Sequence, residues 1–365
     1  MKDYYIYTEQ MTVGYGGKPL IRNINLHLRR GEILTLIGPN GSGKSTILKS
    51  IIQQLSLLGG AVYLDGRSMA RMPELEVAKR LSVLMTERIR PELMTCEDVV
   101  STGRYPYTGR LGILTAEDRR IVRESMALVH SEDLADCDFS EISDGQRQRV
   151  LLARAICQEP EVIILDEPTS FLDIRHKLEL LAILRRMAKE KGITVIMSLH
   201  EIDLAQKISD KIICVKGDAI SHFGAPETIF REDIIRELYE IDNGSFDPCF
   251  GSIELPRPEG TPRVFVLAGG GTGIPVFRKL QKENVPFAAG VLYTNDIDYQ
   301  LARILAMETV TEAPFQEISD EAFARACELM KSCERVIDTG VPVGMCNRRI
   351  EELRAEAKRL GKLAE

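Results

Sequence analysis

The chain has 365 residues, with 47 basic and 54 acidic side chains and a formal net charge of −7. At about 150 residues per domain, this length predicts at least two structural units. The acidic balance argues against a strongly basic nucleic-acid surface, and no run approaches the roughly 18 apolar residues that span a bilayer. Residues 1–10 contain no apolar signal core, so we expect membrane attachment to come through a partner protein.

A strand-like run over residues 32–37 leads into a glycine-rich turn and then a helix-like run. The turn matches G-x-x-x-x-G-K-[ST], in the strand, turn and helix order that a phosphate-binding loop requires. Glycines let backbone N–H groups surround phosphates, and the helix start adds partial positive charge. We expect Lys44 to reach the β- and γ-phosphates and the Ser45 hydroxyl to ligate Mg²⁺. The predicted loop residues are Gly38, Pro39, Asn40, Gly41, Ser42, Gly43, Lys44, Ser45 and Thr46.

A second strand-like run, residues 162–165, is apolar throughout and ends at two carboxylates. Such a run is typical of a strand buried on both faces of a parallel sheet, so Asp166 and Glu167 should emerge at the edge where ligands bind. Buried carboxylates without partners are costly, which argues for Mg²⁺ and water nearby. We expect Asp166 to bind Mg²⁺ through water, and Glu167 to be the base that polarises the attacking water.

Turn-forming residues are concentrated at 243–248 and 256–262. They predict a first domain over residues 1–255, a linker over 256–262 and a second domain over 263–365. Alternating strand and helix signals make the second domain a small Rossmann-like α/β unit. Eight scattered cysteines, with no C-x-x-C pair, favour a reduced compartment and match no zinc pattern.

The second domain has its own glycine-rich turn, residues 269–273, directly after a strand-like run. Such a turn can cradle a phosphate or another small ligand. Ile274 stands at the last position of the G-x-G-x-x-G pattern, and no acidic residue is clearly placed for a ribose. Ligand sensing and a structural or dimerising role are both compatible with this pattern, and an independent enzyme is a third interpretation.

Three further motifs accompany the two already described: S-D-G-Q at 143–146, S-F-L-D at 170–173, and a lone His200 after the strand-like run 194–199. Together, over residues 2–255, these motifs resemble the ABC ATPases. The resemblance implies an α/β fold of the P-loop NTPase type, with a RecA-like core, an antiparallel β subdomain and an α-helical signature subdomain. His200 would hold the γ-phosphate and orient the attacking water.

The same resemblance implies a dimer, in which two copies of the chain pack head to tail around two ATP molecules. Tyr15 would stack on the adenine ring. From the other copy, Ser143 and the backbone around Gly145, at the start of the signature helix that runs on from Gln146, would contact the γ-phosphate. Asp173 would couple the two ATP sites.

Two positions depart from the family pattern. The family usually has glycine where Asp144 stands, and we expect its carboxylate to point outward, away from phosphate. The segment 81–87 lies where a glutamine normally reaches Mg²⁺ and senses the membrane partner, but it contains no glutamine. Thr86 aligns with that position most simply, and Glu87 is the alternative. Glu87 offers a carboxylate oxygen to the metal but cannot donate a hydrogen bond as an amide does.

The G-R-Y-P sequence at 103–106 is similar to that of ATP-binding subunits of importers for iron–siderophore complexes, haem and cobalamin. Its aromatic and proline residues are suited to a groove that receives a permease helix, and a core-facing turn is the alternative. A similar glycine-rich tail follows the ATPase domain in some corrinoid importers, which favours cobalamin as substrate.

The sequence therefore predicts the ATP-binding subunit of an ABC importer, acting with ATP and Mg²⁺ at the cytoplasmic face of the cell membrane. Its partners would be a second copy, an integral membrane permease and, indirectly, a substrate-binding protein, with no nucleic acid. One alternative is a soluble ABC ATPase without a permease, although neither a long coiled-coil insertion nor a second ATPase unit is present. Another is an ATPase regulated by a metabolite-sensing second domain.

Overall fold

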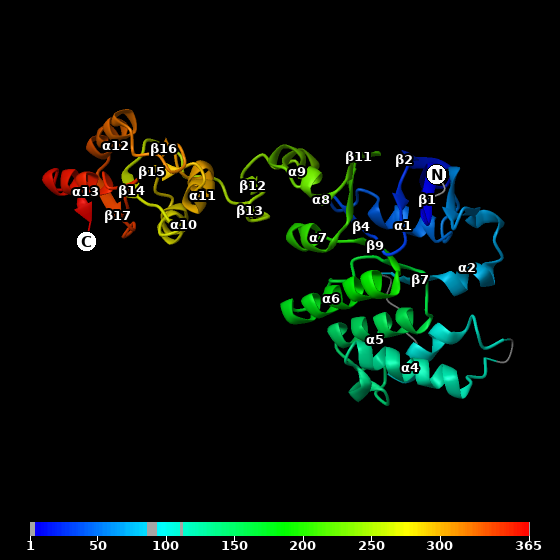
Figure 1. Ribbon diagram of the computed structural model, residues 1–365. Coiled ribbons are helices and arrows are strands. Elements are labelled where there is room, and N and C mark those ends of the chain that lie inside the picture. The colour runs from blue at the N-terminus through cyan, green and yellow to red at the C-terminus, as the bar shows by residue number, and fades with distance from the viewer. Residues whose placement is uncertain (1–3, 86–92, 110–111, 365) are drawn as a thin grey trace. The chain divides into compact units, whose positions relative to one another are not determined.

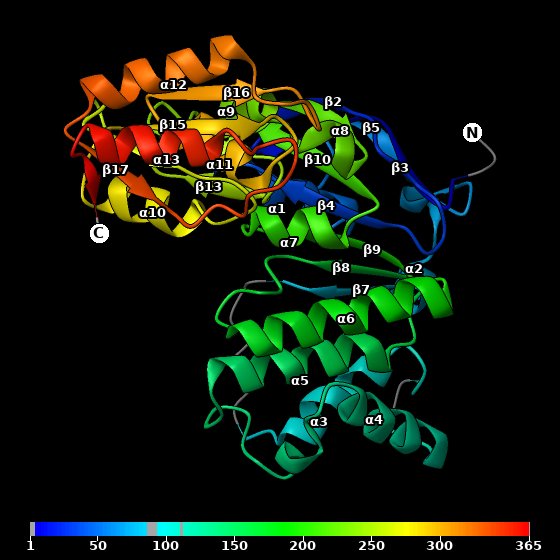
Figure 2. The same ribbon diagram turned by 60° about the vertical axis from the view of Figure 1, so that its left-hand side comes forward.

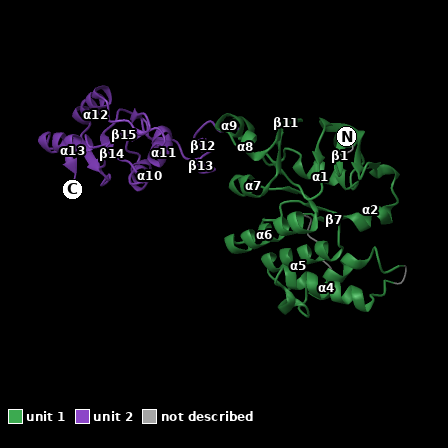
Figure 3. Cartoon of the chain, in the orientation of Figure 1, with its two compact units in different colours: residues 1–239 green, residues 240–365 purple. Residues whose placement is uncertain are grey.

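The computed structural model describes residues 4–85, 93–109 and 112–364 (Figure 1). The chain forms two compact units, residues 1–239 and 240–365 (Figure 3). No helix among the described residues is both long and apolar enough to cross a membrane.

A six-stranded sheet forms the centre of the first unit. Its strand order is β11-β10-β4-β9-β8-β7, and all neighbours are parallel except β10 and β11. Every residue of β4, β8 and β9 is buried, because both faces of these strands are covered. The strands are β4 (Ile33–Ile37), β7 (Leu81–Leu84), β8 (Val162–Leu165), β9 (Thr194–Ser198), β10 (Lys211–Lys216) and β11 (Ala219–Gly224).

Among the described residues, α5 (Asp144–Cys157) contacts β7 of this sheet, and six further helices contact its strands. Figure 2 shows α6 and α7 running alongside the strands. The six further helices are α1 (Lys44–Ile51), α2 (Glu74–Arg80), α6 (Ile174–Lys191), α7 (Ile202–Ile208), α8 (Pro226–Ile229) and α9 (Glu232–Tyr239). This arrangement confirms the predicted RecA-like core.

An antiparallel sheet adjoins this core, in the order β2-β1-β5-β6 with β3 paired to β1. Its inward side chains, such as Val13 and Leu64, share one apolar cluster with Ile47 of α1 and Leu34 of β4. The predicted antiparallel β subdomain is therefore confirmed. Its elements are β1 (Ile6–Tyr15), β2 (Lys18–Ile24), β3 (His27–Leu28), β5 (Gly59–Leu64), β6 (Arg67–Ser68) and the short η1 (Met69–Arg71).

Three helices, α3 (Cys96–Ser101), α4 (Ala116–Leu128) and α5 (Asp144–Cys157), contact one another and form the predicted helical subdomain, below α6 in Figure 2. Each begins at a hydroxyl side chain that accepts a hydrogen bond from the N–H three residues later, which satisfies one free donor of the first turn. The three cap residues are Thr95, Thr115 and Ser143. Short helices η2 (Thr102–Arg104) and η3 (Glu132–Leu134) complete this part.

The second unit is built on a five-stranded parallel sheet in the order β16-β15-β14-β17-β18. Side chains of its central strand alternate between two apolar clusters. Val264 and Val266 face α10 and α11, whereas Phe265 and Leu267 face α12 and α13, as the period of a strand requires. The unit is therefore a doubly wound, Rossmann-like domain, as predicted.

The elements of this sheet and its helices alternate along the chain. They are β14 (Val264–Leu267), α10 (Ile274–Lys282), β15 (Phe287–Tyr293), α11 (Ile297–Leu305), β16 (Glu308–Glu312), α12 (Asp320–Ser332), β17 (Arg335–Asp338), α13 (Ile350–Arg359) and β18 (Leu363–Ala364).

The two compact units meet earlier in the sequence than the predicted boundary after residue 255. The second unit begins at Glu240 and includes a hairpin of β12 (Ser245–Asp247) and β13 (Ser252–Glu254). The Glu254 side chain is 1% exposed and pairs with both terminal nitrogens of Arg278 on α10. A buried carboxylate requires such a partner, so the hairpin belongs with the second unit.

Candidate nucleotide-binding and hydrolysis site

The loop between β4 and α1 has a backbone that only glycine can form at two positions. Gly38 and Gly43 have φ values of 147° and 97°. Residues that carry a Cβ rarely adopt such positive φ values. A Cβ at Gly38 would lie 2.2 Å from the carbonyl oxygen of Val215, and one at Gly43 would lie 2.8 Å from Ile21. The loop therefore has the tight, open-backbone form that leaves N–H groups available to an anion.

Lys44 lies at the start of α1 and is 5% exposed. Its Nζ donates hydrogen bonds to the carbonyl oxygens of Gly38 and Pro39, both at 2.8 Å. Burial lowers the pKa of the Lys44 ammonium, and the carboxylates of Glu167 and Asp166 oppose that shift. Because a phosphate is a stronger acceptor than a carbonyl, an anion in the loop would compete for this ammonium.

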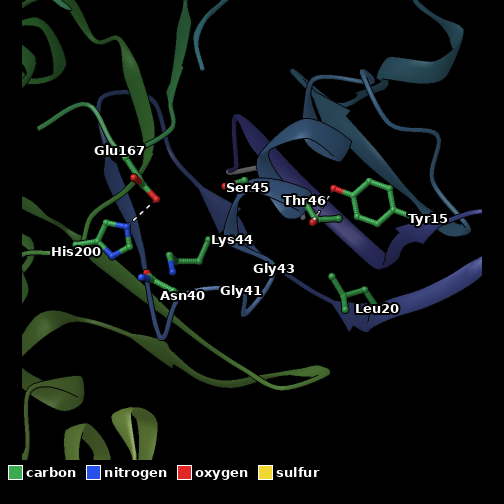
Figure 4. Close-up of a pocket in the computed structure, with 10 residues that line it drawn as sticks. All are labelled: Tyr15, Leu20, Asn40, Gly41, Gly43, Lys44, Ser45, Thr46, Glu167 and His200. Atoms are coloured by element: carbon green, nitrogen blue, oxygen red, sulfur yellow. Dashed lines mark hydrogen bonds and ion pairs between the residues drawn. The ribbon is translucent and has the colours of Figure 1, made fainter. Parts of the chain in front are cut away.

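A cavity of about 420 Å³ brings together residues that are far apart in the sequence (Figure 4). Such a volume is within the range of small-molecule sites. Six of the nine predicted loop residues line it, whereas Gly38, Pro39 and Ser42 do not. The lining residues are Tyr15, Leu20, Asn40, Gly41, Gly43, Lys44, Ser45, Thr46, Glu167 and His200.

One side of the cavity carries an aromatic ring and an aliphatic side chain. Tyr15 ends β1, is 53% exposed, and its hydroxyl lies 3.2 Å from the Thr46 hydroxyl. Leu20 of β2 lines the cavity beside it. The exposed ring fits the predicted stacking on adenine. Sequence reasoning missed Leu20, which reaches the loop only because β2 pairs with β1.

Glu167 and His200 lie together on the opposite side of the cavity (Figure 4). Glu167 Oε1 is 2.6 Å from His200 Nε2, and the Ser170 hydroxyl donates a hydrogen bond of 3.2 Å to Glu167 Oε2. The backbone of Glu167 has φ 50°, a left-handed conformation that is uncommon for a residue other than glycine. A carboxylate held by a histidine next to a phosphate loop has the geometry of a general base with an orienting partner.

Two residues near His200 also hold this edge of the sheet, and sequence reasoning found neither. Ser198, at the end of β9, donates a hydrogen bond of 2.7 Å to Asp166 Oδ1. Glu201 accepts a hydrogen bond of 2.8 Å from Thr169 and forms an ion pair with Lys177 of α6. The only sequence signal was their closeness to His200.

The oxygen donors of the site fit Mg²⁺. Ser45 and Asp166 offer a hydroxyl and a carboxylate, the hard ligands that Mg²⁺ prefers. No group of three or more His, Cys, Asp or Glu side chains that could hold a metal occurs among the described residues. A metal here would therefore complete its coordination with water and phosphate oxygens. Thr86 and Glu87, the candidates for the missing glutamine, lie outside the described residues.

The signature residues do not line the cavity of their own chain. Ser143 and Gln146 form a capping box: the Ser143 N–H donates to Gln146 Oε1 at 2.9 Å, and the Gln146 N–H donates to Ser143 Oγ at 3.3 Å. Asp144 pairs with Arg147 at 2.6 Å, so its carboxylate points along its own helix. Gly145 lies in the same first turn.

Asp173 caps α6, where its Oδ1 accepts a hydrogen bond of 2.9 Å from the His176 N–H. Its side chain is 66% exposed. Like the signature residues, it is absent from the lining of the cavity.

In the second unit, backbone N–H groups of the glycine-rich turn donate hydrogen bonds to side-chain carboxylates of the same chain. The Gly270 N–H donates to Asp296 Oδ2 at 2.7 Å, and the Gly273 and Ile274 N–H groups donate to Asp298 at 3.0 and 3.1 Å. Asp298 is fully buried, and burial raises the pKa of its carboxyl group while these N–H groups oppose the shift. The donors that would cradle a phosphate therefore have partners.

We accordingly expect one nucleotide per chain. A calorimetric titration of the full-length protein with a non-hydrolysable ATP analogue should give one bound nucleotide per chain. The carboxylates of Asp296 and Asp298 would repel a phosphate at the glycine-rich turn of the second unit. NAD should not bind. A second binding event that survives in Lys44→Ala would contradict this expectation.

Comparisons with known proteins agree with the two-unit division. The ABC transporter family model matches residues 21–170, and the MJ0874 family model matches residues 287–364. The chain is 44% identical over 286 residues to an uncharacterized ABC transporter ATP-binding protein of Methanocaldococcus jannaschii, MJ0873, covering 78% of this chain and 99% of that one.

Two further comparisons extend this similarity. The cobalamin import ATP-binding protein BtuD of Halobacterium salinarum is 30% identical over 346 residues, which are 93% of this chain and 86% of that one. Among solved structures, the dimeric ABC transporter cassette MJ0796 aligns with a TM-score of 0.55 and 26% identity, covering 60% of this chain and 98% of that chain.

Proposed function

The chain belongs to the ABC transporter family of ATP-binding proteins, and from this membership we propose that it drives uptake of a metal chelate through a partner permease, with cobalamin or a related corrinoid as the first candidate. Members of this family hydrolyse ATP to power transport. The observation that carries the proposal is the cavity in which the phosphate loop faces the Glu167–His200 pair.

The proposed chemistry uses groups that are already close together. The loop N–H groups and Lys44 bind the phosphates, and Glu167 polarises the attacking water, which His200 orients. Mg²⁺, held by Ser45 and Asp166, would supply charge neutralisation on the phosphate oxygens. His200 lies 2.6 Å from Glu167, so it keeps the carboxylate facing the phosphate loop.

A second copy of the chain is part of this proposal. Ser143, Gly145 and Gln146 are absent from the lining of the cavity, so in one chain nothing from the signature helix reaches the nucleotide. The related cassette MJ0796 is dimeric. We infer that the signature helix of one copy closes the cavity of the other, and that closure moves the permease.

The G-R-Y-P sequence contains both a structural residue and a candidate permease contact. Arg104 is 5% exposed and donates to Asp118 Oδ1, Glu159 Oε2 and the Cys157 carbonyl at 2.8–2.9 Å. It therefore fixes this turn to the end of α5. Tyr105 is 62% exposed, and we propose that it contacts the permease at the cytoplasmic face of the membrane.

The second unit supports the choice of cobalamin, because the alignment with the halobacterial cobalamin importer covers 93% of this chain and so extends well into residues 240–365. Iron–siderophore complexes and haem are the other candidate substrates. A substrate-binding protein would deliver any of these to the permease, without touching this chain.

The test is uptake of labelled cobalamin, haem and a ferric siderophore by cells that lack this gene, complemented with wild type or Glu167→Gln. Cobalamin uptake should return only with wild type, since transport requires hydrolysis. Restored haem or siderophore uptake would keep the importer and replace the substrate. If wild type restores none of the three, the importer proposal fails, and an ABC ATPase without a permease becomes the better interpretation.

A further inference from the structure

Ser198 makes hydrogen bonds to both acidic residues of the hydrolysis site. Its Oγ donates to Asp166 Oδ1 at 2.7 Å and accepts from the Glu167 N–H at 2.9 Å. We propose that Ser198 is a positioning residue for ATP hydrolysis: its hydroxyl fixes the Asp166 carboxylate toward the metal and the Glu167 backbone toward water. The inference rests on the proposed ATPase chemistry, and not on the transported substrate.

The fold brings the hydroxyl to this place. Strands β8 and β9 are parallel with Leu165 opposite Met197, so the next residue of each strand, Asp166 and Ser198, emerges side by side at the carboxyl edge. Ser198 is fully buried and Asp166 is 2% exposed. Water does not readily reach this depth to replace a lost hydrogen bond. Removing the Ser198 hydroxyl should therefore cost Asp166 a hydrogen bond that solvent does not restore.

The bond to the Glu167 N–H acts on a disfavoured backbone conformation. Glu167 has φ 50°, where a residue with a Cβ needs support from its surroundings. Ser198 holds the backbone of Glu167, and His200, two residues later, contacts its carboxylate at 2.6 Å. One short segment therefore fixes the base at both ends, which is how preorganised sites limit the reorganisation that reaction would otherwise need.

Burial alone does not explain Ser198, as a second serine of the first unit shows. Ser50 of α1 is also fully buried, but its hydroxyl has no hydrogen-bond partner among the described residues. It lines no part of the cavity. Ser50→Ala is therefore a matched control that removes a buried hydroxyl without removing a contact.

Four variants distinguish the effect of losing the Ser198 hydroxyl from the effect of changing the side-chain volume. Ser198→Ala and Ser198→Val lack a hydroxyl, whereas Ser198→Thr keeps it and has nearly the same shape as valine. We expect kcat to fall about tenfold or more in the alanine and valine variants, since each lost bond is worth roughly a factor of ten. The threonine variant should recover most of the activity, and Ser50→Ala should match wild type.

Metal binding gives a readout that does not depend on turnover. Binding of Mn²⁺, as a probe for Mg²⁺, to the protein with a non-hydrolysable ATP analogue should weaken severalfold in Ser198→Ala and Ser198→Val, because Asp166 loses its fixed orientation. Affinity for the analogue without metal should stay within about twofold of wild type, since the loop holds the phosphates.

Two results would overturn the proposal. One is a kcat in Ser198→Ala within twofold of wild type. The other is equal activity and equal Mn²⁺ affinity in the threonine and valine variants, which would make shape, not the hydroxyl, the determinant, even if the alanine variant folds poorly. Absence of ATPase activity in wild type would contradict the proposed function itself, and is thus distinguishable from failure of the Ser198 inference.

Discussion

Glu167→Gln is expected to bind Mg-ATP about as well as wild type and to hydrolyse it roughly 10²–10⁴ times more slowly, the usual contribution of a general base. Glutamine has nearly the same shape and can still contact His200, so the cavity should persist. Its amide cannot accept a proton from water, so the base is lost while binding remains.

The same variant should accumulate as an ATP-bound dimer. In the proposed dimer the signature helix of one copy closes the ATP cavity of the other, and we expect hydrolysis to be the step that lets the two copies separate. Phosphate release measures the first effect, and light scattering after chromatography with and without ATP measures the second. Glu179→Gln is a suitable control, because Glu179 lies on α6, pairs with Arg175 and does not line the cavity. Turnover in Glu167→Gln within tenfold of wild type would remove the assignment of the base.

Lys44→Ala should lose nucleotide binding altogether at ordinary concentrations. Hydrogen bonds to charged groups contribute roughly 1.5–3 kcal/mol each, so loss of contacts to two phosphates should weaken binding by at least about 100-fold. The variant also loses the two hydrogen bonds from Lys44 to the loop carbonyls. We expect the loop to keep its form, since the glycine backbone conformations at Gly38 and Gly43 remain.

Titration with a fluorescent ATP analogue tests this expectation. Lys49→Ala, on the same helix but outside the lining of the cavity, makes the same change in charge and should bind as wild type does. Equal weakening in both variants would indicate a general electrostatic effect instead of a specific contact.

The sequence was most informative where chemistry lies in one contiguous segment. The loop around Lys44 and the pair Asp166 and Glu167 could be located because each motif contains both its structural context and its reactive groups. Tyr15 and His200 needed the family resemblance, since only folding brings them to the loop. Both residues line the same cavity as Lys44 and Glu167.

What the sequence could not predict depends on pairing between distant segments. Ser198 reaches Asp166 only through the register of β8 with β9, and Leu20 reaches the cavity only through the pairing of β2 with β1. The division at residue 240 differs from the boundary predicted after residue 255 for a similar reason. Glu254 of β13 pairs with Arg278 of α10, two elements further along the chain, and composition does not reveal this contact.

The carboxylates at the second glycine turn have a consequence for stability in the cell. A fold that depends on a bound nucleotide gains stability in proportion to the logarithm of ligand concentration, and loses it when the ligand is scarce. In residues 240–365 the anions at the glycine-rich turn are the carboxylates of Asp296 and Asp298, which belong to the same chain. Their effective concentration is therefore set by the chain and does not change with the concentration of any metabolite. Starvation should therefore leave this unit as resistant to proteolysis as before, while the ATP-binding unit becomes easier to cleave.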